Sequence, residues 1–304
     1  MNRAPQQHTD IPTGDWIDRL LPENLRPYAR LMRLDRPIGT WLLLLPCWWA
    51  VALASDSLPD LWLMTLFAAG ALIMRGAGCV VNDVYDRDFD KKVDRTQTRP
   101  LASGQLALWQ ALIFLAALLL LGFLVLLQFN MFTVWLGVAS LALVFTYPLA
   151  KRITWWPQFV LGLAFNWGAL MGWSAVRGSI EWPAMVLYVG GIFWTLGYDT
   201  IYAHQDKNDD ILIGIKSLAL RLGDSSKKWI TVFFASAITL FLLSGAMAEQ
   251  GAGYYILMIA AVSHATWQLS GWNTDDPANC LRRFRSNRDF GLIVLVAIIA
   301  GKFM

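Results

Sequence analysis

Asn82-Asp83-Val84-Tyr85-Asp86-Arg87-Asp88-Phe89-Asp90 is a dense acidic run that begins where a long apolar segment ends. A second run, Asp199-Thr200-Ile201-Tyr202-Ala203-His204-Gln205-Asp206-Lys207-Asn208-Asp209-Asp210, follows another apolar segment in the same way. Asp86 and Asp206 are 120 positions apart, and so are Asp90 and Asp210. This shared spacing hints at two related halves, and we expect the two acidic runs to form one site.

The composition around these runs is that of a membrane protein. Of the 304 residues, 56% are hydrophobic and only 15% are charged, which is too apolar for a soluble domain of this length. The net charge of +3 gives no support for nucleic-acid binding. The three cysteines lie far apart in the sequence, so they predict neither a disulfide framework nor a cysteine metal site.

The chain contains largely uncharged stretches long enough to cross a hydrocarbon core of ~30 Å. They are residues 38–55, 61–82, 106–128, 131–149, 157–176, 183–203, 229–248, 252–270 and 289–304. The sequence therefore predicts an all-α integral membrane bundle of about nine transmembrane helices. We expect residues 1–37 to be a cytoplasmic N-terminal segment and residues 38–304 to be the polytopic domain. Residues 16–33 fit either an amphipathic helix at the membrane interface or a solvated lead-in.

Basic residues predict the orientation of the chain. If the N-terminus is cytoplasmic, nearly every Lys and Arg falls on the cytoplasmic side; only Arg177 and Lys302 fall outside it, and Arg75 lies within the second span. Both acidic runs follow even-numbered spans, so both are expected at the cytoplasmic face. The lack of a recognisable transit peptide favours a bacterial inner membrane over a mitochondrial one.

The spacing within each acidic run predicts a shared chemistry. Residues four apart lie on one face of a helix, so Asn82, Asp86 and Asp90 form a polar stripe, and Asp199, Asp206 and Asp210 form a similar one. Stacked carboxylates beside a low-dielectric region require a cation. Oxygen ligands without His or Cys suit Mg²⁺, which bridges carboxylates to substrate phosphates. The alternative is a pair of ordinary solvated loops, which the matched spacing and shared side argue against.

Three further polar residues leave alternatives open. Arg75, inside an apolar span and seven residues before Asn82, could contact a diphosphate or form an ion pair with a neighbouring helix. Asn166 favours a hydrogen bond between helices over a substrate contact. His204 lies between the acids of the second run and could be a general base, although the role of a bystander is favoured.

The two runs resemble the motifs of the UbiA family of membrane prenyltransferases. Residues 82–90 fit Asn-Asp-x-x-Asp-x-x-x-Asp, and residues 206–210 fit Asp-x-x-x-Asp. The resemblance extends from about Leu34 to Leu222. Within the family, this pattern resembles the branch that prenylates 4-hydroxybenzoate. Its further matching stretches are residues 34–40, 76–79, 94–96, 99–101, 198–203 and 214–217.

This resemblance implies a nine-helix bundle around a central cavity, with Mg²⁺ and diphosphate held between the two motifs. The residues carried over as metal ligands are Asn82, Asp83, Asp86, Asp90, Asp206 and Asp210. Those carried over as catalytic are Asp86, Asp90, Asp206, Asp210 and Lys151. The expected substrate-binding residues are Asn82, Arg75, Tyr147, Arg152, Arg36, Arg33, Asp199 and Tyr202.

The implied reaction moves a polyprenyl group from polyprenyl diphosphate to the ring carbon of 4-hydroxybenzoate ortho to its hydroxyl, a step of ubiquinone biosynthesis. Another acceptor, such as dihydroxynaphthoate or homogentisate, would use the same chemistry. A divalent-cation or lipid transporter is the alternative from another class. It predicts acids distributed across the bilayer, whereas these acids cluster at one face. A phospholipid-forming transferase requires an Asp-Gly pair and a following Ala-Arg that residues 83–90 lack.

Overall fold

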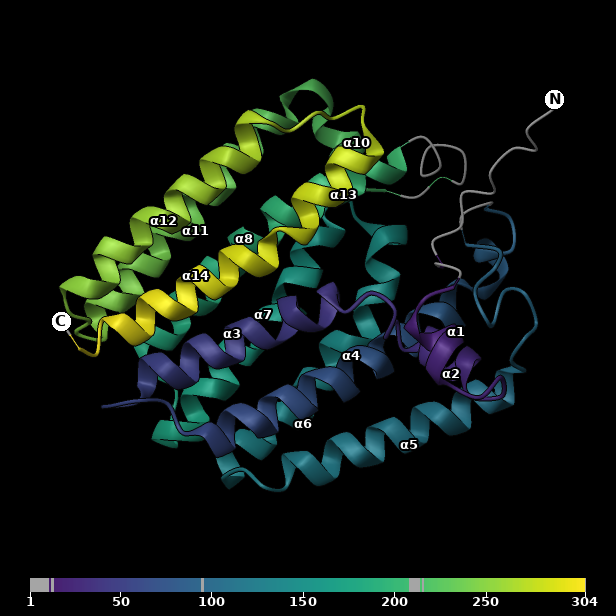
Figure 1. The fold of residues 1–304 in the computed structure, drawn as a ribbon, viewed down its shortest axis with the longest axis horizontal. Coiled ribbons are helices and arrows are strands. Elements are labelled where there is room, and N and C mark those ends of the chain that lie inside the picture. Colours follow the sequence, from purple (N-terminus) through teal and green to yellow (C-terminus); the bar gives the residue numbers. More distant parts are fainter. Residues whose placement is uncertain (1–10, 12–13, 94–95, 208–213, 215, 304) are drawn as a thin grey trace. The chain divides into compact units, whose positions relative to one another are not determined.

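The computed structural model describes residues 11, 14–93, 96–207, 214 and 216–303, and over these residues it contains helices and no strand (Figure 1). The all-α prediction is therefore confirmed. The chain divides into two units, one of residues 1–39 with 70–125 and the other of residues 40–69 with 126–304.

The first unit holds two short N-terminal helices, α1 (Trp16–Leu20) and α2 (Arg26–Leu31). Asp15 caps α1 by accepting hydrogen bonds from the backbone N–H groups of Ile17 and Asp18. Pro27 lies in the first turn of α2, where its missing N–H costs nothing. Residues 16–33 therefore form two separate helices instead of one continuous amphipathic helix.

Helix α2 packs on the long helices of the same unit, α4 (Leu61–Asp90) from Gly70 onward and α5 (Leu108–Leu126) up to Val125. Tyr28 of α2 meets Phe114 of α5 edge to face, with ring centroids 5.0 Å apart. One buried cluster joins α2, α4, α5 and the loop between the two long helices; it consists of Leu31, Ala77, Val80, Leu101, Leu106, Ala111 and Leu118. The segment before the first span is thus fixed against the helix that carries the first acidic run.

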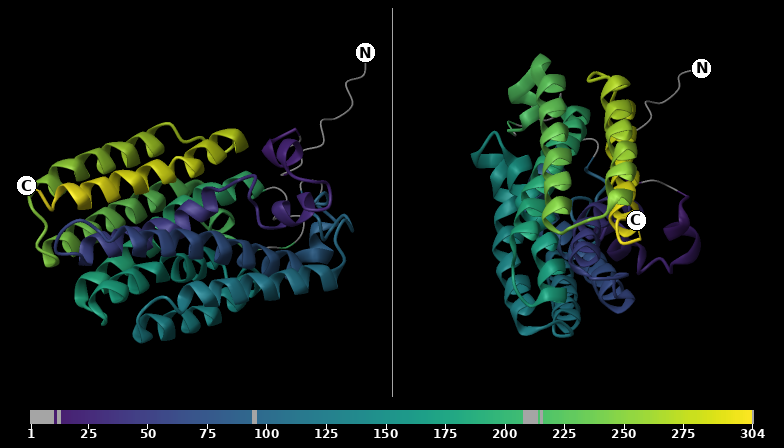
Figure 2. Two further views of the ribbon diagram at one scale, coloured as in Figure 1. Left: turned by 60° about the horizontal axis from the view of Figure 1, so that its bottom comes forward. Right: turned by 90° about the vertical axis from the view of Figure 1, so that its left-hand side faces the viewer.

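The second unit contains most of the remaining helices (Figure 1). They are α3 (Ile38–Ala54) from Thr40 onward, α6 (Met131–Ile153), α7 (Pro157–Arg177), α8 (Trp182–Ala203), η1 (His204–Asp206), α10 (Leu218–Leu222), η2 (Gly223–Ser225), α11 (Ser226–Met247), α12 (Ala252–Ser270), α13 (Pro277–Arg285) and α14 (Asn287–Ala300). Helix α8 packs against both α7 and α11, and α12 runs beside α14 (Figure 2).

A cluster of buried aromatic side chains fills the core of the second unit. Trp49 of α3 lies 5.0 Å from Trp194 of α8 and 5.2 Å from Phe241 of α11, measured between ring centroids. Trp194 also stacks on Phe290 of α14. Each of these four rings is almost completely buried. Because large rings carry most of the contact area in a core, this cluster is what holds four helices of the unit together.

Within the described residues, six helical segments are long and apolar enough to cross a membrane. They are residues 61–90, 108–126, 131–150, 157–177, 182–206 and 218–247. The other three predicted spans are also helices at the expected positions: α3 has 17 residues, α12 has 19 and α14 has 14. The predicted total of nine transmembrane helices stays a prediction.

Candidate active site

The first acidic run is helical throughout, because α4 continues to Asp90, eight residues beyond the predicted end of the span. Asn82 is half-buried, and Asp86 and Asp90 are buried. The spacing of four on one uninterrupted helix sets all three side chains on one face, as the sequence predicts. Three polar groups thus line the last turns of a helix that begins as a membrane span.

Two arginines neutralise two of the acids on this helix. Nη2 of Arg33 lies 2.7 and 2.9 Å from the carboxylate oxygens of Asp83, whose side chain is 1% exposed. Nη1 of Arg99 lies 3.0 Å from Oδ2 of Asp90 and 3.5 Å from Oδ1 of Asp83. We call these four residues the arginine–aspartate network. Its charges balance, so the repulsion between Asp83 and Asp90 is offset within the protein.

Arg33 reaches Asp83 because the chain turns sharply at the end of α2. Arg33 has a φ of 60°, in the left-handed region that favours glycine. The backbone N–H of Leu34 donates to the carbonyl of Ala29, which closes the helix end, and Nη1 of Arg33 donates to the carbonyl of Arg30 at 3.0 Å. A left-handed conformation costs a non-glycine residue roughly 1–2 kcal/mol, and in this turn the guanidinium of Arg33 pairs with Asp83.

The network changes the interpretation of three residues. Asp83, expected among the metal ligands, is engaged by Arg33 and Arg99, and Arg33, expected at the substrate, is buried against Asp83. Arg99 was not among the expected site residues, although it lies in a stretch that resembles the family. The number of acids on α4 is the sequence signal that could have pointed to Arg99, because acids stacked on one buried helix need cations from nearby segments.

Two other predicted cations are placed by local contacts. Nε of Arg36 lies 3.0 Å from a carboxylate oxygen of Asp35, and burial raises the pKa of Asp35 although Arg36 opposes this shift. Arg75 donates a hydrogen bond to the sulfur of Cys79, and its guanidinium lies against Gly39, where any Cβ would collide with it. Because Gly39 has no side chain, it leaves room for the guanidinium of Arg75.

The second acidic run is less regular than its spacing predicts. Helix α8 ends at Ala203 and continues as the 3₁₀ turn η1, so Asp199 and Asp206 do not lie on one uninterrupted α-helix. The predicted stripe stays a prediction, because a 3₁₀ turn, with three residues per turn instead of 3.6, falls within it. Asp199 and Asp206 are half-buried. Asp210 lies outside the described residues.

The turn η1 is anchored by side chains on either side. The imidazole of His204 is buried, with Nε2 2.9 Å from the hydroxyl of Ser226 at the start of α11 and its ring edge against Trp272. Tyr202 is half-buried with its ring against Phe284 of α13, the centroids 4.6 Å apart. These contacts give His204 a structural role, where the sequence favoured a bystander.

The remaining predicted residues lie on α6 and α7. Tyr147 is half-buried and Arg152 is exposed at the end of α6, while the side chain of Lys151 lies outside the described part of the chain. Nδ2 of Asn166 donates to the hydroxyl of Thr195 at 2.8 Å, which is the hydrogen bond between helices that the sequence favoured.

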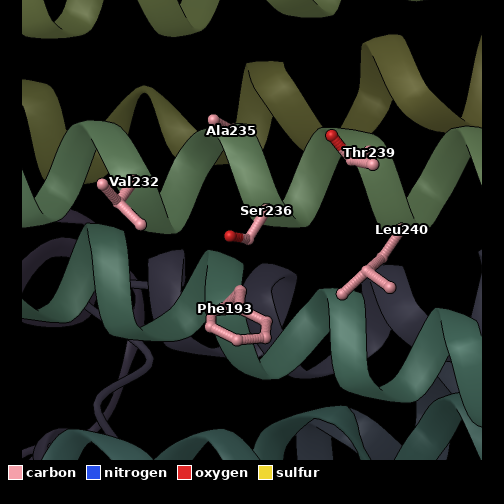
Figure 3. Close-up of a pocket in the computed structure, with 6 residues that line it drawn as sticks. All are labelled: Phe193, Val232, Ala235, Ser236, Thr239 and Leu240. Atoms are coloured by element: carbon pink, nitrogen blue, oxygen red, sulfur yellow. The ribbon is translucent and has the colours of Figure 1, made fainter.

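An apolar hollow lies between α8 and α11 (Figure 3). Its lining contains no charged side chain, so it differs in kind from the acidic runs; it consists of Phe193, Val232, Ala235, Ser236, Thr239 and Leu240.

The oxygen donors of the described residues fit Mg²⁺ that is bound together with a diphosphate. Among these residues, no group of three or more His, Cys, Asp or Glu side chains could hold a metal ion by itself. Asn82, Asp86 and Asp90 place side-chain oxygen atoms on one face of α4, with Oδ2 of Asp90 on Arg99, and Asp206 places a carboxylate on η1. Since Mg²⁺ commonly takes one or two carboxylates and completes its shell with water and substrate phosphates, this donor set fits a metal that arrives with a diphosphate.

Comparison with known proteins identifies the family. Residues 43–293 match the UbiA prenyltransferase family. This chain belongs to the UbiA prenyltransferase family. The 4-hydroxybenzoate polyprenyltransferase, mitochondrial, of Arabidopsis thaliana is 52% identical over 296 residues, covering 96% of this chain and 72% of the relative. The human protein of that name is 50% identical over 284 residues, covering 92% of this chain and 76% of the relative. The resemblance drawn from the two motifs is therefore confirmed.

Solved structures share the UbiA fold. A UbiA homolog from Aeropyrum pernix K1 has a TM-score of 0.68 and 26% identity, covering 87% of this chain and 97% of its own. A UbiA homolog from Archaeoglobus fulgidus bound to DMAPP and Mg²⁺ has a TM-score of 0.70 and 19% identity, covering 90% and 97%. Together with the six long apolar helices, these findings make the chain an integral membrane protein. The named relatives are mitochondrial, so the expected preference for a bacterial membrane finds no support in them.

Proposed function

We propose that this UbiA family member transfers a polyprenyl group from polyprenyl diphosphate to the carbon of 4-hydroxybenzoate ortho to its hydroxyl, with release of pyrophosphate. The observation that carries the proposal is the buried acidic face of α4, backed by two arginines, in a chain about half identical to proteins named 4-hydroxybenzoate polyprenyltransferase. The acids offer ligands for a metal–diphosphate, and the similarity supports the acceptor.

The first acidic run supplies one half of the diphosphate site in this proposal. Asn82, Asp86 and Asp90 form one polar face of α4, so their oxygens would hold Mg²⁺. When bound, Mg²⁺ neutralises charge that develops on the departing pyrophosphate. Asp206 and Asp210 form the second half, and Asp199 supports them.

Cationic and hydroxyl groups of the chain complete the diphosphate contacts. Lys151, Arg152 and Tyr147 come from one helix, α6. Arg36 comes from the segment before α3, and Arg75 comes from α4. Cations held beside the leaving group favour cleavage of the allylic carbon–oxygen bond because they stabilise the negative charge that builds up there. The resulting allylic cation is then attacked by the phenol ring, whose proton is lost to restore aromaticity.

Within the arginine–aspartate network, Arg33, Asp83 and Arg99 position this machinery, and Asp90 is the member that would bind the metal. Arg99 holds one oxygen of Asp90, which fixes the direction of that carboxylate on α4. Asp83 forms ion pairs with both Arg99 and Arg33 and so fixes the two guanidinium groups. We therefore assign Asp83 and Arg33 a positioning role in place of the ligand and substrate roles that the motif suggests.

The proposal includes a membrane arrangement. The prenyl chain is itself apolar and reaches the site through the bilayer, which suits a protein with six long apolar helices. The excess of Lys and Arg around the acidic runs supports an orientation with the N-terminus and both motifs on one side of the membrane, the cytoplasmic side in the usual topology. Residues 38–304 would form the transferase domain and residues 1–37 its N-terminal segment.

The experiment that tests the function is a product assay with a panel of acceptors. Purified protein is incubated with a polyprenyl diphosphate, Mg²⁺ and 4-hydroxybenzoate, dihydroxynaphthoate or homogentisate, and products are identified by mass spectrometry. We expect prenylated 4-hydroxybenzoate and little product from the other two. Folded protein that prenylates a different acceptor would refute the assigned acceptor, and folded protein that prenylates none would refute the reaction.

A further inference from the structure

Arg283 is a buried cation on α13, the short helix that leads into α14 (Figure 1). Its side chain is 4% exposed. The guanidinium carbon lies 3.9 Å from the centroid of the Trp267 ring, on the last turns of α12. Nη2 lies against Gly271, in the space that a Cβ would occupy. The ring face of Trp267 and the backbone of Gly271, which has no side chain, therefore hold this guanidinium in place.

Among the residues that the structure describes, no carboxylate pairs with Arg283. Nε and Nη1 are buried and have no hydrogen-bond partner among the residues that the structure describes. Burial lowers the pKa of this guanidinium, but an arginine keeps its charge in a protein. A buried charge without a partner is costly, and buried donors are normally satisfied. The guanidinium of Arg283 therefore needs an anionic group that accepts its hydrogen bonds and balances its charge.

The surroundings indicate which kind of anion fits. Trp267 is 46% exposed at the end of a long apolar helix, and Trp is enriched where membrane meets water. Arg282 and Arg285, on the same short helix, are exposed and add positive charge. Basic pockets between the ends of membrane helices suit lipid head groups, and phosphate oxygens accept strong hydrogen bonds from guanidinium groups.

We propose that Arg283, seated on Trp267 and Gly271, binds the phosphate of an anionic membrane lipid, with Arg282 and Arg285 attracting the head group. This lipid site is distinct from the acidic runs. It adjoins the second one through the contact of Phe284 with Tyr202, so a bound lipid also steadies the end of α8.

The test measures the melting temperature of the purified full-length protein in a neutral detergent. Short-chain phosphatidylglycerol is titrated against phosphatidylcholine of the same chain length. We expect phosphatidylglycerol to raise the melting temperature and to reach half of its effect at a concentration at least about fivefold lower, since one basic residue near a lipid surface contributes that order of preference. Equal effects of the two lipids would overturn the proposal.

Variants separate this site from a general basic surface. Arg283→Gln should abolish the preference and, without lipid, should melt no lower than wild type, because it removes an unpaired buried charge. Arg288→Gln is the matched control: Arg288 is exposed and already paired with Asp289 at 2.8 Å, so the preference should persist. A preference retained in Arg283→Gln, or lost equally in Arg288→Gln, would contradict the assignment.

Two further measurements keep the test decisive. If Arg283→Gln does not fold, Gly271→Ala replaces it, because the new Cβ takes the space of Nη2 and should remove the preference in the same way. Inorganic phosphate is added at the same concentrations as the lipid and should leave the melting temperature unchanged. A shift by inorganic phosphate equal to that of phosphatidylglycerol would make this a site for free anions and refute the lipid.

Discussion

At the scale of single residues, Arg99 carries the most consequence, because it lies between two buried carboxylates. Its Nη1 is within 3.5 Å of both Asp83 and Asp90, and its side chain is largely buried. We predict that Arg99→Ala lowers the free energy of unfolding by about 3–5 kcal/mol, since removing one partner leaves buried charge uncompensated. The measurement is thermal unfolding in detergent. An unchanged melting temperature would show that the network adds nothing to stability.

The matched control for Arg99 is an arginine on α4 that pairs with an exposed acid. Arg87 pairs with the exposed carboxylate of Asp88 at 3.3 Å, and exposed ion pairs contribute little to stability. Arg87→Ala should therefore leave the melting temperature close to that of wild type. Adding Asp90→Asn to Arg99→Ala should recover part of the loss, because it removes one of the two like charges.

Arg33 combines a left-handed backbone with a buried ion pair, so two substitutions separate these effects. Arg33→Ala loses the ion pair with Asp83 and keeps a Cβ at a φ of 60°. Arg33→Gly loses the same pair but relieves the backbone. We predict that Arg33→Gly is the more stable of the two by about 1 kcal/mol, as judged by their melting temperatures. The reverse order would contradict the strained turn.

At the scale of elements, the contact between α3 and α7 depends on two glycines one helical turn apart. Gly168 and Gly172 bring α7 against Cys47, and a Cβ at Gly172 would meet the backbone carbonyl of Cys47 and lie 3.0 Å from the Cβ of Ala50. We predict that Gly172→Ala lowers the free energy of unfolding by about 1–3 kcal/mol, because backbone cannot move aside. Thermal unfolding measures this loss.

Gly78 is the matched control for Gly172. It lies within α4, and a Cβ added there meets nothing within 4 Å. Because alanine forms helix more readily than glycine, Gly78→Ala should leave stability unchanged or slightly higher. Equal losses at Gly78 and Gly172 would mean that helix packing is not what makes Gly172 necessary.

Element positions could be predicted because membrane spans are specified by local composition. The predicted span of residues 61–82 begins where α4 begins, but α4 continues to Asp90. The two ends differ because polar residues continue a helix as well as apolar ones do. The 3₁₀ turn at residues 204–206 could not be predicted, because the buried contacts of His204 with Ser226 and Trp272 that anchor it come from distant segments. The pairing of Arg33 with Asp83 joins residues 50 apart and depends on a turn that hydropathy does not reveal.

At the scale of the whole molecule, the donor set predicts how Mg²⁺ acts. The described residues hold no closed metal site, so Mg²⁺ alone should change the melting temperature little, whereas Mg²⁺ with inorganic pyrophosphate should raise it. Chelation should abolish product formation without unfolding the protein. A large stabilisation by Mg²⁺ alone would instead indicate a resident structural metal.

The central claim is that the acids of the two runs act together in prenyl transfer. The most direct measurement is formation of prenylated 4-hydroxybenzoate from polyprenyl diphosphate and Mg²⁺ by wild type, Asp86→Asn, Asp206→Asn and Asp88→Asn. Asp88 is the control because it lies in the first run but is exposed. We expect a loss of at least about 100-fold in Asp86→Asn and Asp206→Asn, with each still folded, and near wild-type turnover in Asp88→Asn. Full activity in folded Asp86→Asn or Asp206→Asn would contradict the central claim.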